Sequence, residues 1–181
     1  MFVQIQNTPN PNSLKFIPGK KVSLVGSLEV TNINQSNNEL IRNIFSINGV
    51  TGIYLSDDFL SVNKKTDINW EDLKHIIISF INDFYSDGNE HVLGENKIDV
   101  TENNLGEIEK KIINILETKI KPAVARDGGD IKFKEFSNGV VKVQLQGSCS
   151  GCPSSTMTLR QGVQNLLCHY IPDVKEVVAI T

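Results

Sequence analysis

The sequence predicts an α+β protein of two small α/β domains, because strand-like and helix-like segments occur in two groups with a polar stretch between them. Strands are indicated by short runs in which apolar and polar residues alternate, and helices by apolar residues three and four positions apart. The polar stretch, residues 86–101, lacks sustained periodicity, which is typical of a linker. We therefore predict an N-terminal domain at residues 1–85 and a C-terminal domain at residues 102–181.

The N-terminal domain is predicted to contain two β-hairpins, each followed by a helix. In chain order we expect strands at 2–6 and 13–17, a helix capped by Ser36 or Asn37 and ending at Asn48-Gly49, strands at 50–55 and 59–63, and a helix at 70–84. Its histidines, His75 and His91, have no second ligand at metal spacing, and Trp70 is interpreted as a packing anchor. Because no reaction site is indicated, partner docking is assigned to this domain by elimination.

The C-terminal domain is predicted to have the element order α-β-β-α-β. Its elements are a helix at 102–124 that Pro122 bends or ends, strands at 131–136 and 139–146, a helix that begins at Pro153, and a strand at 174–180. The last β-α-β step is a crossover that makes two strands parallel and gives a three-stranded mixed sheet. It also puts the loop before Pro153 at the carboxyl end of a strand, where sites in open sheets collect.

This loop, Gly147-Ser-Cys-Ser-Gly-Cys-Pro153, holds two of the three cysteines at Cys-x-x-Cys spacing. Cys149 and Cys152 are thereby expected at the start of a helix, where unpaired backbone N–H groups and the helix dipole favour an anion. We expect a lowered thiol pKa and a thiolate that binds a metal or attacks a disulfide. The third thiol, Cys168, is sixteen residues from Cys152 and is interpreted as a core or boundary residue.

Charged residues near the loop receive structural interpretations. His169 is expected to be a favourable charge at a helix C-terminus rather than a ligand. Arg126 and Asp130 are close enough in sequence to touch the loop, but turn chemistry with a surface ion pair is the preferred interpretation.

Composition excludes several classes of protein. A formal net charge of −3 with a pI near 5.6 provides no basic field for phosphates, so nucleic-acid binding is not expected. No apolar run approaches the length of a membrane span, and the start of the chain lacks the features of a signal or transit peptide. Three cysteines are too few for a secreted disulfide framework, which places the protein in a reducing compartment, the cytoplasm of a bacterium.

The Cys-x-x-Cys spacing alone leaves cluster or metal binding and redox catalysis both open. A thioredoxin-like thiol–disulfide oxidoreductase is the strongest alternative, although a helix and a β-hairpin before the motif are the wrong order for that fold. A structural zinc site in a dimer is a third interpretation. A purely structural pair of buried cysteines is disfavoured by the Gly- and Ser-rich loop, which we expect to be exposed.

Two stretches of the C-terminal half, Arg126-Asp-Gly-Gly-Asp-Ile131 and Gly147-Ser-Cys-Ser-Gly-Cys-Pro-Ser-Ser-Thr-Met157, resemble the C-terminal domain of the NifU-like (Nfu-type) iron–sulfur cluster scaffold proteins. The N-terminal half is similar to the domain that precedes it in two-domain members, through Thr8-Pro-Asn-Pro-Asn-Ser-Leu-Lys-Phe16 and Ile47-Asn-Gly-Val50. One departure is Ser36-Asn-Asn-Glu39, where a Pro- and Ala-containing helix start is expected.

The resemblance implies a non-catalytic scaffold or carrier. It implies that Cys149 and Cys152 are the ligands of a [4Fe–4S] cluster bridging two subunits, with [2Fe–2S] or mononuclear iron left open as the bound form. It also implies upstream cluster-assembly proteins and apo iron–sulfur recipient proteins as partners. Counting ligands agrees, because a cubane cluster needs four thiolates and one chain offers a suitable pair, so that a homodimer would share one cluster.

Overall fold

The computed structural model describes residues 2–94, 105–151 and 153–180, and the chain divides into two compact units, Met1–Ile98 and Asp99–Thr181. In the first unit the elements are β1 (Gln4–Asn7), β2 (Ser13–Ile17), β3 (Leu28–Val30), η1 (Ile33–Gln35), α1 (Glu39–Ser46), β4 (Val50–Leu55), β5 (Leu60–Lys64) and α2 (Trp70–Ser86). In the second unit they are α3 (Glu107–Ile115), η2 (Leu116–Ile120), α4 (Lys121–Arg126), β6 (Gly129–Ser137), β7 (Val140–Gly147), α5 (Pro153–Tyr170) and β8 (Glu176–Ile180). The predicted α+β class is confirmed.

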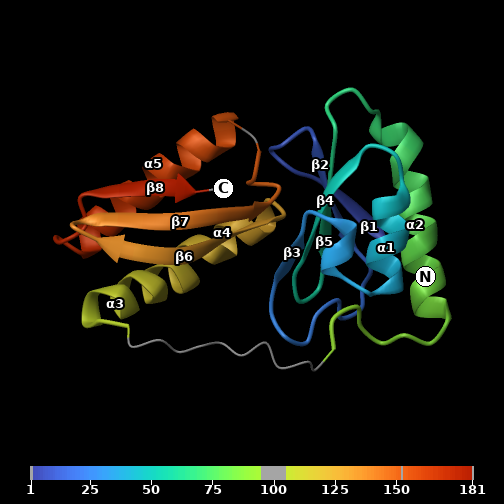
Figure 1. Cartoon of the computed structure of the whole chain (residues 1–181), viewed down its shortest axis with the longest axis horizontal. Coiled ribbons are helices and arrows are strands. Elements are labelled where there is room, and N and C mark those ends of the chain that lie inside the picture. The colour runs from blue at the N-terminus through green and yellow to red at the C-terminus, as the bar shows by residue number, and fades with distance from the viewer. Residues whose placement is uncertain (1, 95–104, 152, 181) are drawn as a thin grey trace. The chain divides into compact units, whose positions relative to one another are not determined.

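The first unit is a five-stranded antiparallel sheet in the order β1-β2-β5-β4-β3, with α1 and α2 beside it (Figure 1). Apolar side chains of both helices and of the central strands form one core, whose fully buried large members include Phe16, Leu40, Ile41, Ile44, Ile53, Leu60, Ile77 and Ile81. Both predicted hairpins are present, since β1 pairs with β2 and β4 pairs with β5. The alternation of apolar residues along these strands therefore located the sheet correctly.

Three details of the first unit differ from the prediction. The strand β3, which pairs with β4, and the short 3-10 helix η1 were not predicted. The cap of α1 is Asn38 rather than Ser36 or Asn37, and its side chain accepts a hydrogen bond from the N–H of Ile41 at 3.3 Å. A side-chain oxygen at this position satisfies one of the free N–H groups of the first turn, so the helix starts one or two residues later than predicted.

The beginning of the predicted linker belongs to the first unit. The N–H groups of Val92 and Leu93 donate to the carbonyl of Val22 at 2.9 and 3.0 Å, and Val92 is buried. Ser23 and Leu93 form an isolated parallel bridge. The polar composition of residues 86–91 hid this contact, which depends on the two apolar residues that follow them. The rest of the predicted linker, from residue 95, lies outside the described residues.

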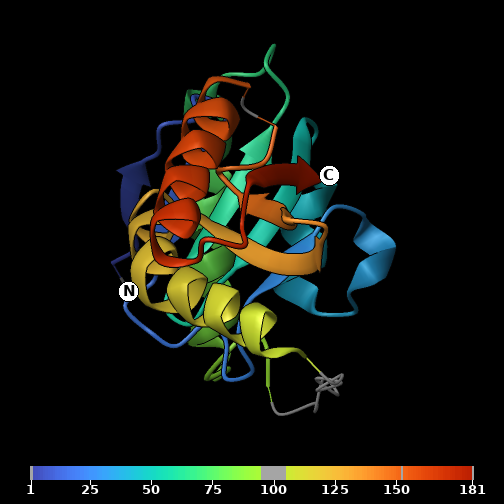
Figure 2. The same ribbon diagram turned by 90° about the vertical axis from the view of Figure 1, so that its left-hand side faces the viewer.

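The second unit has a three-stranded mixed sheet in the order β6-β7-β8, as predicted. The strands β6 and β7 form an antiparallel hairpin whose turn contains Asn138 and Gly139, both with positive φ. The crossover through α5 makes β7 and β8 parallel. Figure 2 shows α5 and the helical segment from α3 to α4 on the same side of this sheet. Their apolar residues, including Ile112, Val124, Val163 and Leu167, close a separate core over the sheet.

The first helical segment of the second unit ends later and is less regular than predicted. It begins at Glu107 after Gly106, whereas the expected start at 102 falls on residues that are not described. Pro122 does not end it, because α4 continues to Arg126. The segment before Pro122, η2, is π-helical, and its wider turn accommodates a proline ring that would clash with a regular helix. Within the described ranges, none of the helices has both the length and the apolar character needed to cross a bilayer.

Candidate metal centre

Two glycines shape the loop that follows β7. Gly147 and Gly151 have φ values of 66° and 74°, a region that residues with a Cβ rarely occupy. Between them, the N–H and the hydroxyl of Ser150 both donate to the carbonyl of Gly147, at 3.2 and 2.9 Å. The loop is therefore a tight turn whose backbone depends on glycine at both ends.

Ser148 attaches this turn to the connection between α4 and β6. Its N–H donates to the carbonyl of Gly128 at 3.2 Å, and its hydroxyl donates to the carbonyl of Asp127. These two carbonyls come from the chain reversal that Gly128 makes with a φ of 78°. The segment Arg126 to Ile131 thus holds the cysteine loop through the backbone carbonyls of Asp127 and Gly128.

Cys149 lies in a space that Gly129 leaves open. A Cβ on Gly129 would be 2.5 Å from the Cys149 Sγ and 2.9 Å from the carbonyl oxygen of Gln146, both far inside normal contact. The Cys149 carbonyl also accepts a hydrogen bond from the hydroxyl of Thr156 at 3.3 Å, which ties the loop to the first turns of α5. Gly129 faces Gly147 in the β6–β7 register, so two glycines meet where the thiol needs room.

The loop is less exposed than its composition suggests. Cys149 is only 7% exposed and packs with the core of the second unit, and Ser148 is 2% exposed. Ser150 is half-buried, whereas Gly151 is exposed. The expectation of an exposed loop is therefore wrong for its first half, because the Ser148 hydrogen bonds hold that half against the connection between α4 and β6. Cys149 is therefore buried against the core, and among the described residues of the turn Gly151 is the most exposed.

The second cysteine of the motif, Cys152, lies outside the described residues. Its neighbours in sequence are placed: Gly151 is the last described residue of the loop and α5 begins at Pro153. The prediction that the loop leaves a strand and enters a helix is confirmed. Cys149 is therefore connected by three residues to the N-terminus of an 18-residue helix, where backbone N–H groups favour an anion.

The interpretation of Asp130 as part of a surface ion pair with Arg126 is wrong. Asp130 is 5% exposed, pairs in register with Gln146 directly before the loop, and has its carboxylate 4.0 Å from the Lys121 ammonium. Its carboxylate also accepts the N–H of Ile131 at 2.8 Å, while Arg126 is exposed. Asp130 was misjudged because a Gly-Gly-Asp sequence is typical of a surface turn, whereas here the aspartate is already inside a strand.

The other candidate residues lie where the sequence places them. Cys168 is half-buried in the last turns of α5 and packs against the core, and His169 is exposed in the last turn. Trp70 packs on the core of the first unit, and its indole N–H donates to the carbonyl of Pro11 at 2.9 Å. Among the residues that the structure describes, His, Cys, Asp and Glu side chains form no group of three or more that would hold a metal.

Sequence reasoning missed Gly129, Ser148 and Thr156 as residues that position the thiol. The signal for Gly129 was present, since Gly128-Gly129 is one glycine more than the chain reversal needs. The second glycine permits the close approach of a neighbouring side chain instead. Ser148 and Thr156 were missed because a contact between a hydroxyl and a distant carbonyl has no sequence pattern.

The fold and this loop define a two-domain protein of the NifU/Nfu type, and comparisons with known proteins agree. The family model of the NifU-like domain matches residues 112–178, and that of the scaffold protein Nfu/NifU N terminal matches residues 3–88. The chain belongs to this family.

Curated relatives match over nearly the whole chain. It is 41% identical to NifU-like protein 4, mitochondrial, of Arabidopsis thaliana, covering 98% of this chain and 65% of that protein. It is also 41% identical to the human NFU1 iron-sulfur cluster scaffold homolog, mitochondrial, covering 98% and 71%. A solution structure of a NifU-like protein from Saccharomyces cerevisiae matches 52% of this chain and 86% of its own, at 27% identity and a TM-score of 0.48.

Proposed function

We propose that this protein is an iron–sulfur cluster scaffold or carrier, in which Cys149 and Cys152 ligate a [4Fe–4S] cluster that is handed on to apo proteins. The observation that carries the proposal is the Cys149 loop, which places a thiol beside the start of α5 and fixes its backbone through Ser148 and Thr156. The human relative is named as an iron–sulfur cluster scaffold, and the chain spans 71% of it. The cluster is the cargo of the protein rather than a resident catalytic group, and we propose no catalysed reaction.

The geometry of the loop favours a carrier over an electron-transfer protein. One side of the site is firm, because Cys149 is buried against Gly129 and the core. The other side opens to solvent at Gly151, which is exposed. A cluster held by four thiolates from two such loops would contact the buried side of the loop in each chain and would stay accessible to solvent on the side of Gly151. Accessibility is a requirement for transfer to a recipient.

The thioredoxin-like alternative is less well supported. The element order of the second unit, with a helix and a β-hairpin before the cysteine loop, differs from the βαβ start that a thioredoxin-like motif follows. A structural zinc site remains distinguishable by experiment, since zinc has no visible absorption when bound by thiolates. The burial of Cys149 also suits a structural thiol, but a purely structural role does not account for a second cysteine at the helix start.

Location is a separate question from the site. The cytoplasmic assignment stays a prediction, and the curated relatives are named as mitochondrial proteins. Partners are proposed at the level of class, as apo recipients of the cluster and the proteins that supply it.

Anaerobic reconstitution of the full chain with iron and sulfide tests the proposed function. We expect a Mössbauer spectrum of a [4Fe–4S] cluster, with iron and sulfide in equal amounts. A colourless protein that takes up zinc but no iron would contradict the proposal, as would a thiol pair that catalyses disulfide exchange at the rate of an oxidoreductase.

Replacing Cys168 by serine should leave cluster content unchanged. Cys168 lies near the far end of α5 and packs against the core, so its sulfur is several helical turns from the loop. Iron and sulfide assays after parallel reconstitution of wild type and Cys168→Ser give the answer. A small loss of stability is compatible with the expectation, whereas loss of iron from folded protein would show that a third thiol takes part.

Residues 100–181 alone should fold and take up the cluster. Their helices and strands close a core of their own, and both proposed ligands lie within them. Circular dichroism and the iron content of the isolated second unit check this. If the isolated unit were folded but unable to hold iron, the proposed division of labour between the two units would be wrong.

A further inference from the structure

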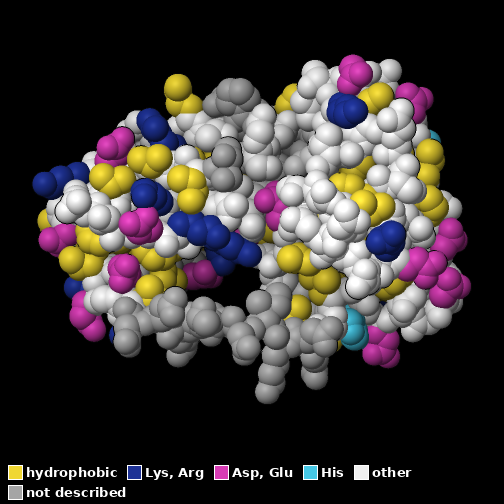
Figure 3. All heavy atoms as spheres, viewed as in Figure 1, with side chains coloured by type: hydrophobic (Ala, Val, Ile, Leu, Met, Phe, Trp, Pro, Cys, Tyr) yellow, Lys and Arg dark blue, Asp and Glu magenta, His cyan; other side chains and the backbone are white. Residues whose placement is uncertain are grey.

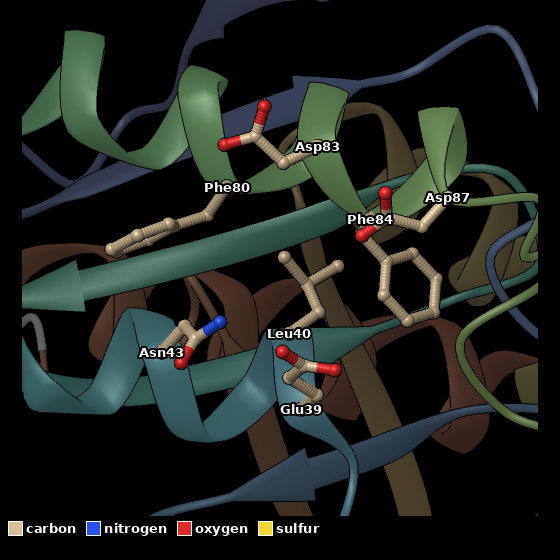
Figure 4. A pocket seen from close by; sticks show the side chains of 7 residues that line it. All are labelled: Glu39, Leu40, Asn43, Phe80, Asp83, Phe84 and Asp87. Atoms are coloured by element: carbon tan, nitrogen blue, oxygen red, sulfur yellow. The ribbon is translucent and has the colours of Figure 1, made fainter.

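The first unit has a pocket between α1 and α2 that the proposed cluster site does not use (Figure 4). Its volume is about 220 Å³, and it is lined by Glu39, Leu40, Asn43, Phe80, Asp83, Phe84 and Asp87. Sites for small molecules usually have volumes of roughly 300–1,000 Å³. This pocket is therefore suited to a single side chain presented by another protein.

The floor of the pocket is apolar and its rim is acidic. Figure 4 shows the rings of Phe80 and Phe84, from α2, around the side chain of Leu40, from α1. Leu40 and Phe84 are buried, at 1% and 9% exposed, and Phe80 is half-buried. The carboxylate-bearing residues on the rim, Glu39, Asp83 and Asp87, are exposed. An occupant thus meets aromatic faces in the centre and negative charge at the edge.

The acids at the C-terminal end of α2 are in an electrostatically unfavourable position. Glu39 is in the first turn of α1, where an acid is favourable, but Asp83 lies in the last turn of α2 and Asp87 is its C-cap. The negative end of the α2 dipole adds to the field of both aspartates, and no basic residue occupies that last turn. Figure 3 shows acidic side chains gathered over the C-terminal half of α2. The one cation of α1, Arg42, is not among the lining residues.

We propose that this pocket binds an arginine side chain carried by a segment of a partner protein. A guanidinium stacks on aromatic faces and pairs with carboxylates in a planar, two-point geometry, whereas a lysine ammonium is a compact and strongly hydrated charge. The aliphatic part of the arginine would lie against Leu40 and the two rings. The inference rests on the proposed function only in that a carrier needs partners to dock.

The test uses the cluster-free full chain and two peptides, acetyl-Gly-Ala-Arg-Ala-Gly-amide and the same peptide with citrulline, a neutral isostere of arginine. Backbone amide shifts are followed by NMR as each peptide is added to wild type, to Asp83→Asn/Asp87→Asn and to Asp57→Asn/Asp58→Asn. The last variant is the matched control, because it also removes two negative charges, but from exposed positions in the β4–β5 turn. No iron is present, so the outcome is independent of cluster binding.

We expect saturable shifts at residues 39–43 and 80–87 of the wild type, with a Kd on the order of 1 mM for a single side chain. The citrulline peptide should bind at least about tenfold more weakly, because the two peptides differ in charge. Added salt should weaken the binding of the arginine peptide. The control variant should bind like the wild type, and the Asp83→Asn/Asp87→Asn variant should not. Equal binding of both peptides to the wild type would overturn the proposal, as would shifts outside the pocket or an absence of binding.

Discussion

Cys149→Ser protein should hold no cluster after anaerobic reconstitution and should remain monomeric. A serine hydroxyl is a poor substitute for a thiolate, and two chains that each lack one ligand supply only two of the four thiolates that a shared [4Fe–4S] cluster requires. The Ser148 N–H and the hydroxyls of Ser148 and Thr156 donate to backbone carbonyls, and the contact between the Ser148 Oγ and the Cys149 Sγ is a long one of 4.0 Å, so the loop should keep its shape. Cys152→Ser should behave in the same way.

The measurements are iron and sulfide content, visible absorption, and sedimentation of the reconstituted variants. Cys168→Ser is the matched control, because it makes the same chemical change at a half-buried position of the same unit. Wild-type iron content in Cys149→Ser, with the protein folded by circular dichroism, would remove Cys149 from the proposed ligand set.

Gly129→Ala should lower both stability and cluster content. The added Cβ would meet the Cys149 Sγ at 2.5 Å, the Gln146 carbonyl oxygen at 2.9 Å and the Cys149 Cβ at 3.1 Å. The sulfur can turn aside, but the carbonyl belongs to the β7 backbone, so the two strands must separate or the loop must move. Overpacking of this kind costs about 1–3 kcal/mol of unfolding free energy.

The control for Gly129→Ala is Gly162→Ala in α5, where a Cβ meets nothing within 4 Å. That change should stabilise the protein by up to about 1 kcal/mol, because alanine is the better helix former, and should leave the cluster in place. Denaturant unfolding and iron assays of both variants decide the matter. Equal stability and equal iron content in Gly129→Ala and wild type would show that the close contact has no part in holding the thiol.

Long periodic segments could be predicted from the sequence, and contacts between distant segments could not. Val141, Val143 and Leu145 alternate along β7 and are all buried, which is why its position and its hairpin with β6 were found. The three residues of β3 are too few to show a period, so that strand depends on its pairing with β4. The π-helical turn before Pro122 was not predicted, because the apolar residues in it keep nearly the spacing of an ordinary helix.

The features of the site likewise fall into local ones, which could be predicted, and tertiary ones, which could not. The cysteine pair was found because its spacing is local, and the helix start at Pro153 was found because proline favours a first turn. The burial of Cys149 was missed because it results from Gly129 on another strand and from the hydrogen bonds of Ser148 to Asp127 and Gly128. Such positions follow from tertiary structure, in which residues about twenty apart in sequence meet.

The central claim is that two chains share one cluster. The most direct test is to sediment cluster-free and reconstituted protein under anaerobic conditions and to assay iron and sulfide in the same samples. Each chain offers one Cys-x-x-Cys pair, so one cluster must draw ligands from two chains, and cluster binding should drive pairing by mass action. We expect the cluster-free protein to sediment as a monomer and the reconstituted protein as a dimer with one [4Fe–4S] cluster per two chains. One stable [4Fe–4S] cluster per monomer, with no dimer at any concentration, would contradict the shared site.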